Sequence, residues 1–179
     1  MISATSNRIA NQLKRYDSDG RYDVEVLQWQ IGIYLNYAAT IVLTGIFAWL
    51  LNDLLAAVLS MLAFIFIRKF SGGVHLKSLT LCAFISAGIF TVIPLISIDN
   101  KTGLLINLLN CFIFIWKAPN IFEELNKSLI DPYRKIISFA IVASNLVIGS
   151  QVLALTFLVQ AVLILPFWRG GESYEKRDR

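Results

Sequence analysis

One histidine and one cysteine stand close together in the chain, and this pair could do nucleophilic chemistry. His75 is the only histidine among 179 residues, and Cys82, seven positions later, is one of two cysteines. A thiolate is a strong nucleophile, and a neighbouring imidazole can generate it and later protonate a leaving group. On one continuous helix the two residues would stand about 10.5 Å apart along the axis, too far for a hydrogen bond. A working pair therefore requires His75 on a loop that folds back over the start of a helix carrying Cys82.

The neighbouring residues could supply the rest of such a site. Ser78 is suited to cap a helix, which would place Cys82 in the first turn, where the positive end of the helix dipole favours a thiolate. Gly72 and Gly73 provide backbone freedom for a folded-back loop, and their N–H groups could line an oxyanion hole. Arg68 could orient a substrate carboxylate or stabilise an oxyanion.

Simpler explanations account for the same residues. A cysteine is often a small hydrophobic residue within a helix, and a histidine in a basic loop is often only solvated. Arg68 would serve equally well as a basic anchor at a membrane surface. The spacing of His75 and Cys82 does not choose between these readings.

The composition indicates what kind of molecule must position these groups. Hydrophobic residues make up 56% of the chain and charged residues 16%, against roughly a quarter charged in soluble domains. A soluble globule of this size could not hide so much apolar surface. A soluble enzyme, a disordered chain and a nucleic-acid-binding module are therefore disfavoured, and the formal charge of +4 fits basic loops beside a lipid bilayer. One histidine and two separated cysteines cannot complete a metal site, and we expect no cofactor.

Six apolar stretches suit transmembrane helices, although several are shorter than the roughly 20 residues that usually cross a bilayer. They are residues 34–51, 54–67, 79–98, 104–116, 136–149 and 152–168. With six spans, fifteen of the sixteen lysines and arginines fall on one face, because the short turns at 52–53 and 150–151 hold none. The positive-inside rule therefore predicts an all-α integral membrane protein with about six transmembrane helices and both termini in the cytoplasm. Two of the short helices could instead be re-entrant hairpins, which would leave the basic loops on the same face of the membrane.

We expect a single membrane-embedded domain over residues 1–179. Residues 1–33 form its cytoplasmic or interfacial N-terminal part, 34–168 its transmembrane helices and 169–179 a cytoplasmic tail. In the N-terminal part Ile9, Leu13 and Tyr16 fall on one face of a helix. This pattern favours an amphipathic helix lying in the plane of the cytoplasmic leaflet, the alternative being a surface helix that leads into the first span.

Polar residues inside the predicted spans have a structural explanation. Interhelical hydrogen bonds are the usual role of such side chains, and they are Asn107, Asn110, Asn145 and Gln160. Charged residues are absent from the spans, which argues against a proton-coupled transporter. Cys111 lies in the middle of a span, where we expect it to pack.

The segment from Arg68 to Cys82 resembles the signature of the accessory gene regulator B (AgrB) family of bacterial membrane peptidases. The family core reads R-x4-G-x-H-x6-C and is matched by Arg68, Gly73, His75 and Cys82. A second family feature, Ala-Pro followed by Asn-Lys-Pro, is present as Ala118-Pro119 and, with wider spacing, 126–127 followed by serine instead of proline. This departure is typical of a divergent member.

The resemblance implies a membrane cysteine endopeptidase at the cytoplasmic face of a bacterial cell membrane. Such proteins cut a short amphipathic precursor peptide and keep its N-terminal part as a thioester, which an internal cysteine or serine resolves into a cyclic quorum-sensing peptide. Cys82 would be the nucleophile and His75 the general base and acid. Family members work as homodimers, which the sequence neither supports nor excludes. The alternatives are a small peptide exporter without proteolytic activity and a non-catalytic membrane scaffold.

Overall fold

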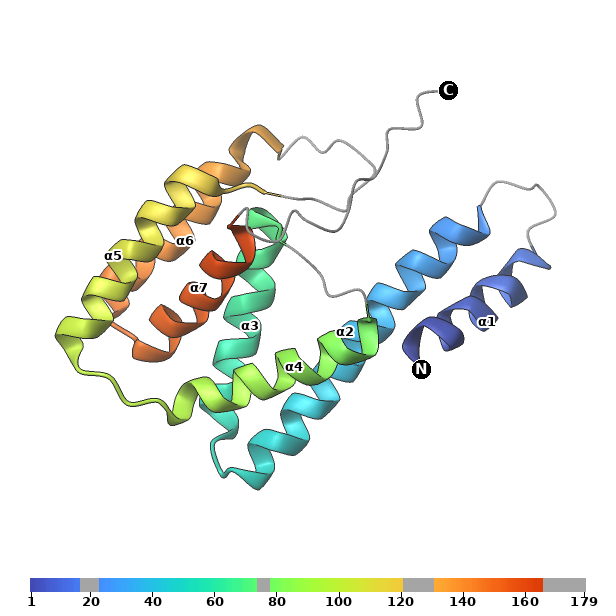
Figure 1. Ribbon diagram of the computed structural model, residues 1–179, viewed down its shortest axis with the longest axis horizontal. Helices are drawn as coiled ribbons and strands as arrows, with labels where there is room; N and C mark the ends of the chain where they lie inside the picture. The colour runs from blue at the N-terminus through green and yellow to red at the C-terminus, as the bar shows by residue number, and fades with distance from the viewer. Residues whose placement is uncertain (17–22, 74–77, 121–130, 166–179) are drawn as a thin grey trace. The chain divides into compact units, whose positions relative to one another are not determined.

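The computed structural model describes residues 1–16, 23–73, 78–120 and 131–165, which form helices joined by short connections (Figure 1). The elements of this part of the chain are α1 Ile2–Lys14, α2 Val24–Leu50, α3 Leu54–Ser71, α4 Leu79–Val92, η1 Ile93–Leu95, α5 Asn100–Lys117, η2 Asp131–Tyr133, α6 Arg134–Ile148 and α7 Gln151–Ile164. The described ranges contain no strand, and their one isolated bridge joins Gly72 to Asn120. The predicted all-α class is confirmed.

Each of the six apolar stretches overlaps one of the helices α2 to α7. Two of these helices, α2 with 27 residues and α3 with 18, are long and apolar enough to cross a membrane, whereas α4 and α7 are apolar but shorter. Six crossings and the orientation of the termini therefore stay predictions. α2 begins at Val24, ten residues before the predicted stretch, because Asp23 caps it and the Asp23 carboxylate accepts the N–H of Glu25.

Two tight turns separate helices that the apolar pattern alone could have merged. α2 ends where Asn52 adopts a φ of 57°, and the N–H of Asp53 bonds to the carbonyl of Ala48 at 3.1 Å. Gly149, with a φ of 69°, ends α6, and its N–H bonds to the carbonyl of Asn145 at 2.8 Å. A left-handed residue stops a right-handed helix and satisfies its last carbonyls. The structure thus confirms the two breaks that the distribution of basic residues indicated.

The described residues form two compact units. The first comprises α1, α2, α3 up to Leu62, α4 and η1, and the second comprises the rest of α3, α5, η2, α6 and α7. In the first unit α2 packs against α4. The buried residues of α2 recur every four positions and are small or polar: Gly32, Asn36, Thr40, Thr44 and Ala48. Small side chains let helix backbones approach closely, which is how helices associate in lipid.

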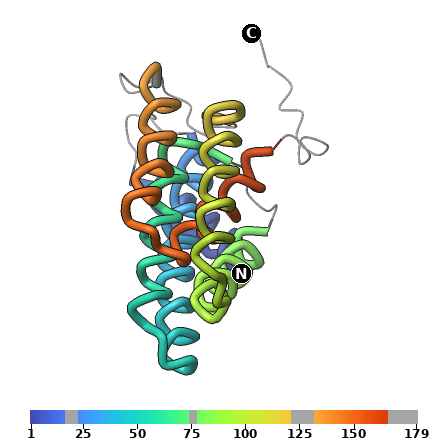
Figure 2. The backbone as a smooth tube through the Cα atoms, turned by 90° about the vertical axis from the view of Figure 1, so that its left-hand side faces the viewer, coloured from blue at the N-terminus to red at the C-terminus, as the bar shows by residue number. Residues whose placement is uncertain are grey.

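In the second unit α5 packs against α6 and α7 (Figure 2), and Ile67 of α3 joins their apolar core. The buried members of this core are Ile67, Cys111, Phe114, Ala118, Val142, Leu153, Phe157, Ala161 and Ile164. The predicted packing role of Cys111 is confirmed by its place in this cluster.

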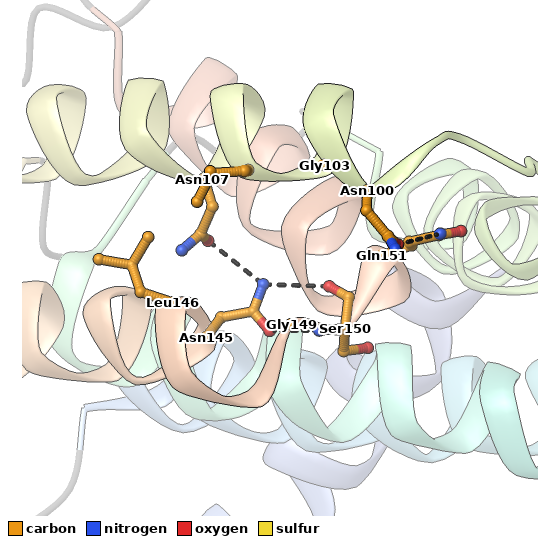
Figure 3. Close-up of a pocket in the computed structure, with 9 residues that line it drawn as sticks. Asn100, Gly103, Asn107, Asn145, Leu146, Gly149, Ser150 and Gln151 are labelled. Atoms are coloured by element: carbon orange, nitrogen blue, oxygen red, sulfur yellow. Dashed lines mark hydrogen bonds between the residues drawn. The ribbon is translucent and has the colours of Figure 1, made fainter.

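Buried amides link the helices of the second unit (Figure 3). The Nδ2 of Asn145 donates to the Oδ1 of Asn107 at 3.3 Å and to the carbonyl of Ser150 at 3.0 Å. The Nδ2 of Asn110 donates to the carbonyl of Ala154 at 2.9 Å. The predicted interhelical role of these asparagines is confirmed, since each amide satisfies groups on a second helix or at its start.

A small pocket lies at the end of the second unit where α5 begins and α6 turns into α7. Its volume is about 290 Å³. It is lined by Asn100, Gly103, Leu104, Asn107, Asn145, Leu146, Gly149, Ser150 and Gln151. Just before α5, Asp99 caps the helix, and a hydrogen bond from the Thr102 side chain, with main-chain hydrogen bonds, lowers the pKa of the Asp99 carboxyl from its usual value.

Candidate active site

Cys82 lies in the first turn of α4, within the first unit. The helix begins after Ser78, whose backbone is extended and whose hydroxyl accepts the N–H of Leu81 at 3.3 Å. The N–H of Cys82 bonds to the carbonyl of Ser78 at 2.9 Å. The cysteine is reduced and half-buried. The predicted start of this helix is confirmed, and a thiol at the partly positive end of a helix is well placed to act as a nucleophile.

The N-terminal helix contacts the same helix start, which the sequence did not indicate. α1 packs against α2 and α4 and buries Ser6 and Ala10. The N–H of Ile2 donates to the Oγ1 of Thr80 at 3.2 Å. Because Thr80 is two residues from Cys82, α1 is bound to the turn that carries the candidate nucleophile.

Two of the three residues predicted to form the apolar face of the N-terminal helix are exposed. Leu13 is 48% exposed, and Tyr16, just beyond the helix, is 87% exposed. The face that α1 turns toward the protein consists instead of small residues, Ser6 and Ala10. The other exposed positions of α1 are mostly polar, among them Asn7, Arg8 and Asn11, and the position of the helix in the plane of a leaflet stays a prediction.

The end of α3 makes a sharp turn in the second unit. After Ser71, Gly72 has a φ of 69° and Gly73 a φ of 129°, conformations that favour glycine. The N–H of Gly72 donates to the carbonyl of Arg68 at 2.9 Å, and the Nη2 of Arg68 donates to the carbonyl of Gly73 at 3.2 Å. The Arg68 guanidinium also lies 5.7 Å from the centre of the Phe64 ring. Arg68, Gly72 and Gly73 are thus brought together, with the guanidinium stabilising the turn.

Two residues from distant parts of the second unit bind this turn, and sequence reasoning assigned neither of them to the site. Gln160 of α7 is fully buried, and its Nε2 donates to the Oγ of Ser71 at 2.8 Å and to the carbonyl of Gly72 at 2.5 Å. The N–H of Asn120 donates to the carbonyl of Ser71 at 3.0 Å. The available signals were a glutamine in the second half of a mostly apolar helix and an asparagine directly after Ala118-Pro119.

A buried arginine binds the last turn of α3. Arg134, at the start of α6, is 7% exposed, and its Nη1 donates to the carbonyl of Lys69 at 3.4 Å. A cation is favourable at the negative end of a helix. The sequence identified Arg134 only as one of the basic residues of a loop, whereas the structure gives it a specific partner.

Some of the residues that were predicted to form the site lie outside the described part of the chain. His75 lies outside the described residues, as do residues 126–128 of the second family feature. Cys82 belongs to the first unit, and Arg68, Gly72 and Gly73 belong to the second. Within the described ranges, no group of three histidine, cysteine, aspartate or glutamate side chains could hold a metal ion.

Helices α2 and α3, each able to cross a membrane, and a cysteine at the start of an apolar helix indicate a membrane protein with a candidate thiol nucleophile. The profile of the accessory gene regulator B family matches residues 6–168. The chain therefore belongs to the AgrB family, a family associated with the processing of quorum-sensing peptides, and the resemblance seen in the sequence is confirmed.

A curated relative agrees with this assignment. A protein of Halalkalibacterium halodurans that is described as AgrB-like is 27% identical over 200 aligned residues, covering 99% of this chain and 100% of the relative. No solved structure matches the chain.

Proposed function

We propose that this chain is a membrane cysteine endopeptidase that matures a short signal peptide. It would cleave the C-terminal part from a precursor and retain the N-terminal part as a thioester on Cys82. An internal cysteine or serine of the peptide would then displace the enzyme, which gives a cyclic thiolactone or lactone. Membership of the AgrB family and the match to R-x4-G-x-H-x6-C support this proposal.

The observation that carries the proposal is the position of Cys82 in the first turn of α4. The Cys82 thiolate attacks the carbonyl carbon of the scissile peptide bond, and the bond to nitrogen breaks. The leaving amine of the C-terminal fragment takes up the proton that His75 removed from the thiol. The thioester conserves the activation that ring closure needs, whereas attack by water would lose it. A site at the edge of an apolar helix bundle limits the access of water.

The substrate follows from the same chemistry. We propose a short precursor with an amphipathic leader that binds at the bilayer surface and an acidic C-terminal tail. The basic residues that the positive-inside rule assigns to the cytoplasmic face would attract that tail. We place the reaction on the cytoplasmic side of a bacterial cell membrane, with homodimerisation as a further family expectation.

The test uses the full-length protein in liposomes with the amphipathic peptide encoded by a reading frame next to its gene. Intact-mass spectrometry should detect a cleaved peptide and a hydroxylamine-sensitive peptide adduct on the protein. The adduct should be absent from Cys82→Ala, present in the packing control Cys111→Ala, and formed slowly or not at all by His75→Ala. Folded wild-type protein that forms neither product nor adduct would contradict the peptidase and favour a peptide exporter. An exporter should tolerate Cys82→Ala.

A further inference from the structure

We infer that the pocket between the start of α5 and the turn from α6 to α7 binds an uncharged peptide unit, that is, a main-chain amide with a small side chain. The pocket has a volume of about 290 Å³, and all of its lining residues belong to the second unit. This volume is close to the lower limit of small-molecule sites, roughly 300 Å³, which restricts the ligand to a short segment. The inference goes beyond the proposed function and does not depend on it, because Cys82 takes no part in the pocket.

The inner wall of the pocket is a network of amides that bind one another. Asn107 and Asn145 are 2% and 3% exposed. The Nδ2 of Asn145 donates to the Oδ1 of Asn107 at 3.3 Å and to the carbonyl of Ser150 at 3.0 Å (Figure 3). The N–H of Ser150 donates in turn to the Oδ1 of Asn145 at 3.1 Å. These bonds hold the wall in place before a ligand enters, and such preorganisation favours binding.

The outer edge of the pocket carries two amide groups whose hydrogen-bonding capacity is only partly used. The Nε2 of Gln151 donates to the Oδ1 of Asn100 at 3.4 Å (Figure 3), a longer bond than the roughly 2.9–3.0 Å that is usual. The Oε1 of Gln151 and the Nδ2 of Asn100 make no hydrogen bond within the described part of the chain. The edge therefore offers one acceptor and one donor, and a peptide unit carries the matching N–H and C=O.

The lining sets the charge of the ligand. Its residues are asparagine, glutamine, serine, glycine and leucine, so that a charged ligand would lose hydration without gaining a counter-charge. The start of α5 is partly positive, but the Asp99 carboxylate already caps it. Asp99 and Lys101 are exposed, opposite in charge and outside the lining. Leu104 and Leu146 add apolar surface, against which an aliphatic side chain can pack.

Gly103 leaves space in the pocket that neither its backbone nor close packing requires. Its N–H bonds to the carbonyl of Asp99 at 2.9 Å in the first turn of α5, where glycine is less favourable than alanine. A Cβ at this position would lie 3.7 Å from the Cδ1 of Ile98 and 3.9 Å from the Cγ of Gln151, which are ordinary contacts. The missing side chain therefore keeps open the volume beside the Gln151 amide, and a large side chain would fill it.

The experiment compares two probes that differ in charge, N-trifluoroacetylalanine N-methylamide, which is neutral, and N-trifluoroacetylalanine, which is a carboxylate. Fluorine NMR line broadening measures their binding to the full-length protein in lipid nanodiscs, and empty nanodiscs correct for partition into lipid. Gly103→Leu fills the pocket, and Gln151→Met removes the edge amide at similar volume. Gly88→Leu is the matched control, because a Cβ at this glycine of α4 meets nothing within 4 Å. Thermal unfolding is recorded for every variant.

We expect the neutral probe to bind with a Kd on the order of 1 mM, and the carboxylate to bind about tenfold more weakly. Gly103→Leu should weaken binding of the neutral probe by about tenfold, and Gln151→Met by about fivefold, the effect of one hydrogen bond. Gly88→Leu should bind like the wild type.

Binding of the neutral probe no stronger than to empty nanodiscs would mean that the pocket holds only water, and would overturn the inference. Equal binding of both probes, or an equal loss in Gly88→Leu, would overturn it as well. Unchanged binding in Gln151→Met would show that the edge amide recognises nothing, and this variant decides alone if Gly103→Leu fails to fold. The peptidase is tested separately by the adduct on Cys82, so the two proposals can fail independently.

Discussion

The side-chain amide of Gln160 donates a hydrogen bond to the main-chain carbonyl of Gly72, which joins the second half of α7 to the turn after α3. Both residues are buried, and 88 positions separate them in the chain. The AgrB signature runs through this turn, from Arg68 to Cys82. A short local motif therefore depends on a residue far outside it.

We expect Gly73→Ala to destabilise the turn. The φ of 129° at Gly73 is unfavourable for alanine, and the new Cβ would crowd the Nε2 of Gln160. The free energy of unfolding should fall by about 1–3 kcal/mol. Gly45→Ala is the control, because a Cβ at this position of α2 meets nothing within 4 Å. Equal unfolding temperatures for both variants in detergent would refute the prediction.

The docking of α1 should depend on its small buried residues. We expect Ser6→Leu to release α1, because Ser6 is 1% exposed and leaves no room for a larger side chain. Limited trypsin digestion at the basic residues of α1 should then become faster. Ala4→Leu changes an exposed position of the same helix and should leave the digestion rate unchanged. If the two variants are digested equally fast, α1 does not dock through Ser6.

The contact between α2 and α4 should tolerate loss of a hydroxyl but not added volume. The Oγ1 of Thr44 has no hydrogen-bond partner in the described part of the chain, although Thr44 is fully buried. Thr44→Val should therefore leave the unfolding free energy unchanged or raise it, whereas Thr44→Leu should lower it by about 1–3 kcal/mol. Val42→Leu, at a position that is 59% exposed, should be neutral. A neutral Thr44→Leu would mean that the two helices are not closely packed there.

The amide network of the second unit should make a measurable contribution to stability. Asn145→Leu removes the partners of Asn107 and of the Ser150 main chain, which are buried or half-buried. We expect a loss of about 1–3 kcal/mol in the free energy of unfolding. Gln151→Leu, which removes only an exposed contact to Asn100, should cost less than half as much. Thermal unfolding in detergent provides the comparison, and the reverse order would refute it.

The predicted topology can be read from single cysteines in a background of Cys82→Ala and Cys111→Ala. Lys101→Cys, just inside α5, should react with a membrane-impermeant maleimide on intact cells. Lys69→Cys, near the end of α3, should react only after permeabilisation. Both side chains are exposed on the protein. A difference in labelling therefore reports the side of the membrane on which each residue lies. The opposite pattern would invert the topology, and labelling of both on intact cells would rule out six spans.

The sequence by itself determined features that depend on local pattern. Helical class, the breaks at residues 52–53 and 150–151, the N-cap at Ser78 and the packing role of Cys111 all follow from composition, hydropathy, charge and turn chemistry. The family signature was also readable, because its residues lie within fifteen positions of one another. Each of these features is set by near neighbours in the chain.

Only the tertiary structure decided which distant groups meet. Gln160 and Asn120 are amides with many available partners, and nothing near them in the sequence points to the turn at Gly72. The contact of Ile2 with Thr80 likewise joins residues 78 positions apart. Buried polar groups must find hydrogen bonds, but which partner each one takes depends on how whole helices pack. Periodicity predicts that a face is buried, whereas its partner becomes known only from the packed structure.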